Sequence, residues 1–414
     1  MPAPAEPDTV DRARVAAPAA ESRPRAALPA LCVTQICCWG ILYYAFPVLR
    51  TDLTADTGWS SARTTAAFSA ALVLSAVGGI VVGRVVDRRG PRVVMTGGAV
   101  LGAVALVVVA VAANLVVFTL GWLLAGLAMS STFYQPAFAA LTRWYREGRV
   151  RALTTLTLAG GLASTVFAPV TAALTEDLGW RHATLALAAV LLVLPAPLHW
   201  FALRGEWPAH PALADGIPAE PRSRVVRTRP FLLLAAGLTL SGFAMHAVVF
   251  GVIPLFTERG ATATTAAWAL GLGGAGQTLG RVLYAPLAAR TTPVVRTALL
   301  VLAGGATTAL LATVPGPIPL LVAVVVLAGM VRGNLTLIQA TAVTDRWGTA
   351  HYGRLSGVLA APIAIAGALA PWAGSALAPL AGGQAALFAW LGGLSALAAV
   401  LVSRAGAGAA WRGR

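Results

Sequence analysis

Two arginines lie inside long apolar stretches of the sequence, where charged side chains are rare. Arg281 belongs to the stretch 264–289, and Arg332 belongs to the stretch 317–344. All 15 acidic residues fall in tails, loops or the ends of apolar stretches, so none is placed to neutralise either arginine. A guanidinium group binds a carboxylate through parallel hydrogen bonds, and an unpaired charge in an apolar setting is costly. The sequence therefore predicts that a small anionic substrate, such as a carboxylate, pairs with these arginines.

The neighbours of Arg281 on a helix strengthen this prediction. Gln277 precedes Arg281 by four residues and Tyr284 follows it by three, so all three share one helix face. An amide and a phenol beside a guanidinium group suit a carboxylate. The alternative is that backbone carbonyls, helix C-termini and water satisfy both arginines, or that the long Arg281 side chain extends to the polar end of its apolar stretch.

Further polar side chains in the apolar stretches are candidates for the same binding site. His246 is the histidine nearest the middle of such a stretch and is a candidate carrier of a coupling proton. A neutral, hydrogen-bonded histidine is the more common case, and a single Tyr belongs more often to packing or to an interfacial belt. The other candidates are Tyr43, Tyr44, Tyr134 and Gln135. Pro47, Pro136 and Pro254 are expected to kink or break their segments.

Two patterns that resemble cofactor or metal sites do not carry that chemistry. Residues 271–276 match G-x-G-x-x-G, but they lie in an apolar stretch with no preceding strand, which favours close helix packing. Cys32, Cys37 and Cys38 point about 140° and then about 100° apart on one helix, so they do not converge on a metal. We expect no cofactor and no metal site. No nucleophile and base are paired in the sequence, so we expect no enzyme.

The elements that position these residues are membrane-spanning helices. Charged residues make up only 11% of the 414 residues and hydrophobic residues 58%, against roughly 25% charged in soluble proteins. A spanning helix needs about 20 apolar residues, and a barrel would show short alternating segments, which are not found. We predict an all-α membrane protein with twelve transmembrane helices at 28–50, 62–84, 92–112, 114–142, 152–174, 182–203, 231–256, 264–289, 293–313, 317–344, 354–377 and 383–403.

The positions of the arginines predict the orientation. All 30 basic residues are Arg, and all but six lie in the tails or in loops that follow even-numbered segments. Cytoplasmic loops are rich in basic residues, so both termini are expected in the cytoplasm and the chain in the cytoplasmic (inner) membrane. The formal net charge of +15 then follows from topology, and no nucleic acid partner is implied. The exceptions are Arg50, Arg63, Arg181 and Arg259 on the other side, and Arg281 and Arg332 within the membrane.

The sequence is expected to divide into two similar halves. Thr-Thr-Ala-Ala opens both the second and the eighth segments, Arg-Trp closes the fourth and the tenth, and Ala-Pro stands in the fifth and the eleventh. Three matches in the same order indicate duplication, which is common in transporters. We predict six-helix bundles at 28–203 and 231–404, a proline-rich cytoplasmic linker at 204–230, and cytoplasmic tails at 1–27 and 405–414.

One loop motif resembles a family signature. Residues 83–92 fit G-x-x-x-D-R-x-G-x-R, with Gly83, Asp87, Arg88, Gly90 and Arg92 at the defined positions. With twelve segments and a central linker, the chain resembles the major facilitator superfamily over residues 28–404. The resemblance implies a secondary transporter that works by alternating access, with this motif latching the two halves on the inside. Gly83 would allow close helix approach, Gly90 a tight turn, and Asp87 would accept hydrogen bonds and balance the arginines.

A weaker resemblance concerns the substrate. Gly58-Trp59-Ser60 before the second segment and an arginine in the eighth are similar to the monocarboxylate and oxalate–formate branch, in which the matching arginine, here Arg281, binds the substrate carboxylate. The sequence therefore favours a porter of small organic anions, by symport, exchange or facilitated diffusion. The alternatives are an exporter of drugs or toxic metalloids and a membrane receptor without transport. No oligomer is required.

Overall fold

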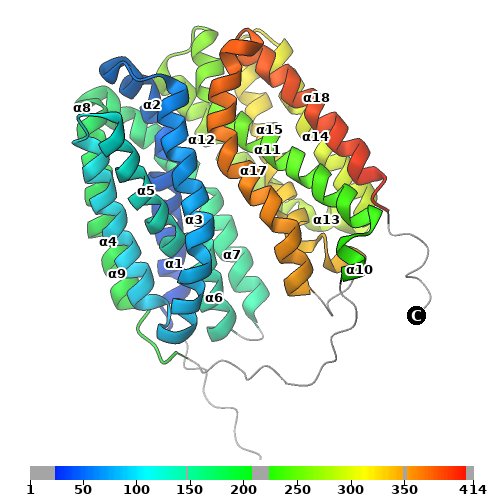
Figure 1. Ribbon diagram of the computed structural model, residues 1–414, viewed down its shortest axis with the longest axis horizontal. Coiled ribbons are helices and arrows are strands. Elements are labelled where there is room, and N and C mark those ends of the chain that lie inside the picture. The colour runs from blue at the N-terminus through cyan, green and yellow to red at the C-terminus, as the bar shows by residue number, and fades with distance from the viewer. Residues whose placement is uncertain (1–23, 146–147, 208–222, 348–351, 407–414) are drawn as a thin grey trace, which may run out of the picture.

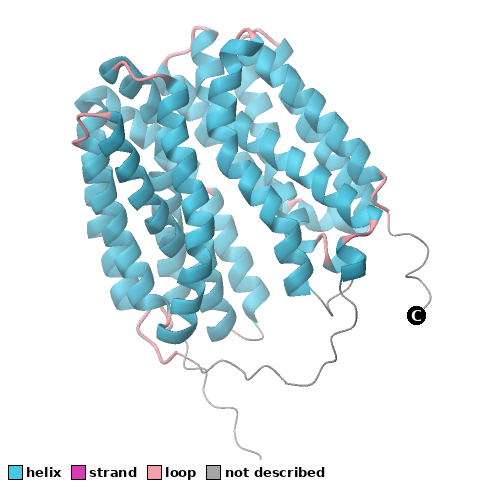
Figure 2. Cartoon of the chain, in the orientation of Figure 1, coloured by secondary structure: helices cyan, strands magenta, loops and turns pink. Residues whose placement is uncertain are grey.

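The structure is a bundle of helices. The computed structural model describes residues 24–145, 148–207, 223–347 and 352–406, and within these ranges it contains helices and no strand (Figure 2). Most of the predicted central linker and tails lie outside the described residues. The all-α prediction is confirmed. Helices are expected because an apolar surrounding obliges each segment to satisfy its own backbone hydrogen bonds.

The helices form two groups that lie side by side (Figure 1). The first group contains α1 (Ala27–Trp39), the π-helical segment η1 (Gly40–Tyr44), α2 (Ala45–Thr57), α3 (Ser61–Arg89), α4 (Pro91–Ala110), α5 (Leu115–Thr132), α6 (Tyr134–Trp144), α7 (Arg149–Gly161), α8 (Ala163–Val193) and α9 (Pro195–Ala202). The second contains α10 (Ser223–Val226), α11 (Arg229–Glu258), α12 (Ala263–Val282), α13 (Tyr284–Arg290), α14 (Pro293–Thr313), α15 (Ile318–Thr341), α16 (Thr344–Trp347), α17 (Tyr352–Ala381) and α18 (Gln384–Ser403).

Helices occupy all the predicted apolar segments, although fewer qualify as spans by length and hydropathy alone. Ten helical stretches among the described residues are long and apolar enough to cross a membrane. One of them, Arg149–Ala202, covers two predicted segments, and Gly179 interrupts it with a positive φ of 74°. The 20-residue helix α12 is not among the ten.

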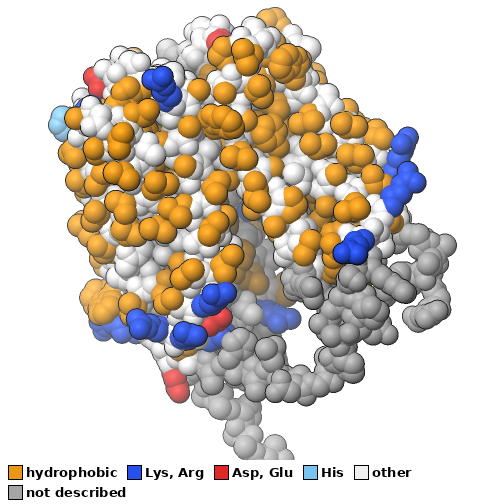
Figure 3. Space-filling view, in the orientation of Figure 1, with side chains coloured by type: hydrophobic (Ala, Val, Ile, Leu, Met, Phe, Trp, Pro, Cys, Tyr) orange, Lys and Arg blue, Asp and Glu red, His pale blue; other side chains and the backbone are white. Residues whose placement is uncertain are grey.

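The outer surface is apolar, as a lipid solvent requires. Val116, Val193 and Leu380 expose 69%, 73% and 78% of their surface. Hydrophobic side chains cover the middle of the molecule in Figure 3, and Arg side chains gather mainly along one edge. A soluble monomer rarely exposes so continuous an apolar surface. The surface therefore supports the prediction that the partner around the bundle is a lipid bilayer.

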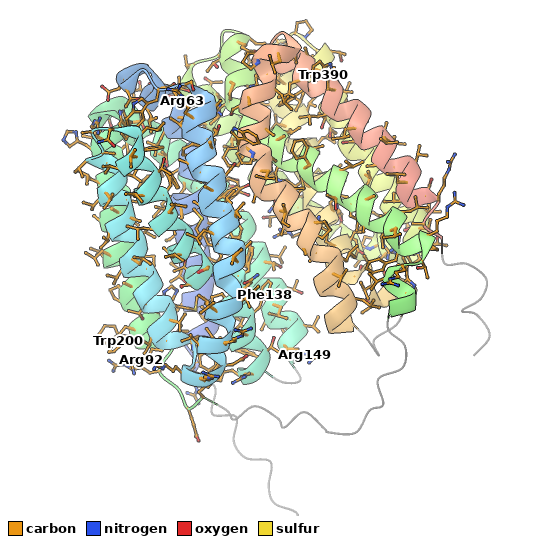
Figure 4. All side chains as sticks on the ribbon, viewed as in Figure 1. Arg63, Arg92, Phe138, Arg149, Trp200 and Trp390 are labelled. Atoms are coloured by element: carbon orange, nitrogen blue, oxygen red, sulfur yellow. The ribbon has the colours of Figure 1, made fainter. Side chains whose placement is uncertain are left out.

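The two ends of the bundle differ. We call the end where residues 83–92 lie the motif end, and the other the opposite end, where Arg63 lies (Figure 4). At the opposite end the two groups are hydrogen-bonded to each other. The Arg50 guanidinium donates to the Ser375 hydroxyl at 2.9 Å, and the Trp372 amide donates to the Ser69 hydroxyl at 3.2 Å. Arg50, which the sequence placed on the outer side, is in fact buried between the groups, with 5% of its surface exposed.

Aromatic packing reinforces the contact between the groups. The Phe46 and Phe68 rings stack with centroids 4.4 Å apart, and Phe250 of the second group lies 5.2 Å from Phe68. Trp122 packs edge-on against the same two rings of the first group. Toward the motif end the two groups diverge in Figure 1. The bundle is therefore closed at the opposite end.

Breaks in the helices fall near two of the three expected prolines. Pro47 has no N–H to donate to the carbonyl of Tyr43, which lies in η1, so the predicted kink takes the form of a π-helical turn. Between α5 and α6, Phe133 is extended at φ −75° and ψ −166°, shortly before Pro136. In contrast, α11 runs through Pro254 without interruption, so no break occurs there.

Candidate functional site

Two adjoining cavities lie between the groups of helices. The larger has a volume of about 400 Å³ and is lined mainly by α3, α5, α6 and α17. The smaller has a volume of about 110 Å³ and is lined by α1, η1, α6 and α7 of the first group and by α11, α12 and α15 of the second. Trp39, Tyr43, Tyr134 and His246 line both, so the cavities meet at these side chains. The lining of the smaller cavity brings together seven of the nine predicted binding residues, Tyr43, Tyr44, Tyr134, His246, Gln277, Arg281 and Arg332.

Arg332 reaches the smaller cavity from the middle of α15. Its Nε donates to the Gln277 Oε1 of α12 at 2.7 Å. Its Nη2 is buried and has no hydrogen-bond partner. Arg332 also lines a third cavity of about 50 Å³ inside the second group of helices. Arg332 therefore retains hydrogen-bonding capacity that the described residues leave unused, and a guanidinium group uses such capacity to bind anions.

Arg281 reaches the same cavity from the last turn of α12. Its Nη1 donates to the backbone carbonyl of Thr157 in the first group, and its Nη2 lies 3.4 Å from the Thr336 hydroxyl. Its Nε is buried without a partner. The contact with Thr157 joins the two groups of helices through the Arg281 side chain.

Gln277 and Tyr284, the expected neighbours of Arg281, do not contact it as the sequence predicted. Gln277 pairs with Arg332 rather than with Arg281. Tyr284 is not among the residues that line either cavity; its hydroxyl lies 3.3 Å from Thr341, and its ring faces Arg296. The reason is the break at Leu283, where α12 ends and α13 begins, so that the regular spacing of one helix no longer relates Arg281 to Tyr284.

The two arginines lack carboxylate partners. Within the described ranges, the ion pairs join Arg143 to Asp87, Arg181 to Asp56 and Arg296 to Asp345. None of these involves Arg281 or Arg332. The charge of the smaller cavity is therefore positive, and the partners that the described residues offer the two arginines are dipoles, among them Gln277, Thr336 and the Thr157 carbonyl.

His246 is fixed in one orientation. Its Nδ1 lies 2.7 Å from the carbonyl oxygen of Gly242. Because a carbonyl oxygen only accepts, Nδ1 must carry the proton, and Nε2 of the neutral ring is left as an acceptor. His246 lines both cavities, so a proton arriving at Nε2 would place a third positive charge beside the arginines.

Several cavity residues were missed by sequence reasoning. Trp39 and Phe133 stack with ring centroids 3.9 Å apart and line the larger cavity. Trp39 precedes Tyr43 by four residues, so helical spacing alone would have placed both on one face. Thr336 lies four residues after Arg332 and has the same signal. Gln135, which was predicted, lines the larger cavity.

The loop motif ties helices together at the motif end. Asp87 accepts a hydrogen bond at 2.7 Å from Arg143 of the same group of helices, and Gly90 makes the turn into α4 with a φ of 78°. The Arg92 Nε donates to the carbonyl of Trp200 at 2.9 Å. Arg88 is exposed. Gly83 does not serve close helix packing here, because a Cβ added to it would meet no atom within 4 Å.

The family follows from the sequence as a whole. A profile of the Major Facilitator Superfamily matches residues 31–317, well over half of the chain. The chain belongs to the Major Facilitator Superfamily. It is therefore a multi-pass membrane protein of a transporter family, as the motif and the apolar segments predicted.

Relatives of this facilitator include a transporter named for monocarboxylates. It is 32% identical to human "Monocarboxylate transporter 11" over 213 residues, 50% of this chain and 42% of that protein. It is 30% identical over 164 residues to an uncharacterized 38 kDa protein of Thermoproteus tenax, 39% of this chain and 43% of that one. The facilitator thus spans less than half of the length of the curated relatives it matches.

Solved transporters share the fold of this facilitator. The nucleoside transporter NupG superposes with a TM-score of 0.72 at 14% identity, covering 92% of this chain and 98% of that one. A bacterial homolog of the human lysosomal transporter Spinster, in an inward-facing and occupied conformation, superposes with a TM-score of 0.68 at 15% identity, covering 91% and 94%. Identities this low concern the fold alone.

The remaining sequence patterns serve packing in this facilitator. The glycines of 271–276 face both neighbours of α12, since an added Cβ at Gly274 would overlap Ser164 and one at Gly276 would overlap the carbonyl of Val326. Cys37 and Cys38 are buried, and the described residues hold no cluster of His, Cys, Asp and Glu able to bind a metal. Trp122 is buried in the core of the first group of helices.

The two motif glycines provide a first prediction. Gly90→Ala should lower the free energy of unfolding by about 1–3 kcal/mol, because its φ of 78° and ψ of 171° suit only glycine. Gly83→Ala should leave the thermal midpoint of the purified protein unchanged or slightly raised, because the added Cβ meets open space in a helix. If Gly83 is packed closely when the two groups of helices meet at the motif end, transport by Gly83→Ala should fall although its stability does not. Equal loss of stability in both variants would contradict this.

Proposed function

We propose that this chain carries a small organic monocarboxylate across the cytoplasmic membrane by alternating access. The single observation that supports this most is the pair Arg281 and Arg332. Both line one cavity between the groups, each has a buried nitrogen without a hydrogen-bond partner, and neither has a carboxylate partner among the described residues. A substrate carboxylate would supply the missing negative charge and accept from both guanidinium groups. The printed name of the human relative points to the same class of substrate.

The proposal includes an orientation and a conformation. The motif end faces the cytoplasm, because the arginines gather there. The larger cavity is then open to the cytoplasm and closed at the outer end by Arg50, Ser375 and the aromatic contact around Phe68. The moving bodies are residues 28–203 and 231–404, joined by 204–230 and flanked by tails at 1–27 and 405–414. Transport requires the outer contacts to break as the motif end closes.

Few protonatable groups line the two cavities, which limits how transport could be coupled to protons. His246 is the candidate at the cavity, with its Nε2 free to take a proton. Symport with a proton would use this group or the substrate carboxyl itself. Exchange of one anion for another needs neither. Transport is measured with and without a pH gradient in the parent chain and in a His246→Gln variant. If the gradient changes transport in neither protein, the mechanism is exchange or facilitated diffusion.

Counterflow in proteoliposomes tests the proposed substrate class. Vesicles containing the purified protein are loaded with unlabelled phenylacetate, and uptake of labelled phenylacetate is measured against external competitors. Monocarboxylates are expected to compete, whereas cationic drugs and arsenite are expected not to. Arg63→Gln, at the exposed opposite end, is the matched control and should behave like the parent chain. Uptake that responds only to cationic drugs would contradict the carboxylate assignment.

Export of drugs or metalloids is the second candidate, because the larger cavity is wide and largely apolar. The metalloid form predicts that transport is lost when the cysteines are replaced, whereas the carboxylate proposal predicts little change. Replacing Cys32, Cys37 and Cys38 together by Ala should change transport by less than about twofold, because Cys37 and Cys38 are buried and the three lie on one helix without other thiols. Arsenite uptake that disappears in this variant would support the metalloid exporter instead.

A further inference from the structure

The two adjoining cavities differ in chemistry. The smaller contains the charge, because Arg281 and Arg332 both line it. The larger, at about 400 Å³, has no charged residue among the side chains that line it. Its walls include Leu72, Met129 and Ile363 and the Trp39 and Phe133 rings. A solute that fills both cavities must therefore be charged at one end and apolar along the rest.

The aromatic wall of the larger cavity is held rigidly. Gln35 is buried, and its Nε2 donates to the carbonyl of Thr132 at 2.7 Å. Its Oε1 accepts from the Trp39 indole N–H at 3.2 Å, so this N–H is already used. Trp39 then stacks on Phe133 with ring planes 14° apart. The wall thus offers ring faces and edges and no free donor from Trp39, which suits an apolar or aromatic body.

The size of the site points the same way. The larger cavity alone, at about 400 Å³, lies in the range of pockets that hold drug-sized ligands, roughly 300–1,000 Å³. An acid of two or three carbons bound at the arginines would leave the larger cavity to water against apolar and aromatic walls. A longer apolar body displaces that water and gains affinity. A second carboxylate in the larger cavity would find no arginine among its lining residues and, while His246 is neutral, no cationic partner there.

We infer that the substrate is an amphipathic monocarboxylate, with its carboxylate at Arg281 and Arg332 and an aromatic or extended apolar body in the larger cavity. This rests on the proposed function and narrows it. Short hydroxy or keto acids and dicarboxylates are poor substrates, because the first leave the larger cavity empty and the second bury an unpaired charge. Trp39 and Phe133 determine specificity for the body, while the arginines recognise the head.

A chain-length series tests the inference on the full-length protein. Acetate, butanoate, hexanoate, octanoate, phenylacetate and adipate are compared by thermal stabilisation and by competition with labelled phenylacetate. Affinity is expected to rise about three- to fourfold per added methylene group, as a buried methylene predicts. Adipate, which has the length of hexanoate and a second carboxylate, should bind at least about tenfold more weakly than hexanoate.

Two variants locate the apolar body. Phe133→Ala should weaken phenylacetate binding about tenfold and acetate binding less than twofold, with Phe201→Ala on the exposed face of α9 as the matched control. Ala364→Trp places bulk into the larger cavity from an exposed position on α17, so it does not depend on the stability of Phe133→Ala. It should exclude octanoate and phenylacetate and leave acetate bound.

The outcomes separate the inference from the proposed function. Affinity that rises with chain length and falls in Ala364→Trp supports both. Acetate binding as tightly as octanoate, or adipate as tightly as hexanoate, would overturn the amphipathic assignment while leaving a carboxylate transporter. No stabilisation or competition by any acid of the series would overturn the proposed function itself, and the inference with it.

Discussion

Arg332→Gln is expected to weaken monocarboxylate binding by at least about tenfold and to reduce transport in proportion. The variant loses the positive charge and the 2.7 Å hydrogen bond to Gln277. It also loses the Nη2 group, which is buried and has no partner in the parent chain. A hydrogen bond to a charged group contributes about 1.5–3 kcal/mol, and about 1.4 kcal/mol corresponds to a factor of ten. Arg332→Lys keeps the charge but lacks the forked guanidinium group, so its affinity should lie between those of the parent chain and Arg332→Gln. Counterflow and ligand-induced thermal shifts measure the effect.

Arg281→Gln should cost as much affinity and, in addition, alter the conformational equilibrium. Its guanidinium group donates across the two groups of helices to the Thr157 carbonyl, a contact that Arg332 does not make. Loss of that contact should change the accessibility of the cavity to thiol reagents when a cysteine is placed at Ala360, which is exposed on α17. Arg63→Gln is the control for both arginines. Normal transport by both variants would refute the anion site.

Gly276→Val is expected to cause the largest loss of stability and, with it, the loss of transport. A Cβ on Gly276 would overlap the backbone carbonyl of Val326 in α15, and backbone atoms in a packed helix cannot move aside as a side chain does. Overpacking costs about 1–3 kcal/mol where side chains can adjust, so the cost here should exceed about 3 kcal/mol. Separation of α12 from α15 would also pull Gln277 away from Arg332.

The control for this prediction is Gly304→Ala in α14. An added Cβ there would lie 3.7 Å from Val331 and 3.8 Å from Leu335, which are ordinary contact distances. Gly304→Ala should therefore keep its thermal midpoint and its transport. The two variants are compared by the yield of monodisperse protein in detergent and by unfolding temperature. A Gly276→Val protein as stable as Gly304→Ala would show that α12 and α15 are not packed through these glycines.

The fold could be predicted because it follows from one-dimensional patterns. Apolar runs of sufficient length specify helices in lipid, and Gly90 at a motif position required a turn that the structure contains. Much of the candidate site was also predicted, because Arg281 and Arg332 stand out in segments that lack other charges. Arginine at such depth is costly enough that it must face a cavity or a partner.

The rest depended on irregular backbone and on contacts between the groups, which periodicity does not reveal. The break at Leu283 removed Tyr284 from the face of Arg281, although their spacing suits one helix. The carbonyl of Thr157 binds Arg281 from the other group of helices, 124 residues away in the chain. Gly83 has a motif position that suggests close packing, yet no atom lies within 4 Å of an added Cβ.

The most direct test of the account compares an acid with its neutral amide. Binding of phenylacetate and phenylacetamide is measured by isothermal titration to the parent chain and to Arg332→Gln. The two ligands differ in charge and hardly in shape, so their ratio of affinities isolates recognition of the carboxylate. We expect a preference for the acid of at least about tenfold in the parent chain and its near loss in Arg332→Gln. Equal binding of acid and amide to the parent chain, or a preference that survives in Arg332→Gln, would contradict the claim that this arginine binds the substrate carboxylate.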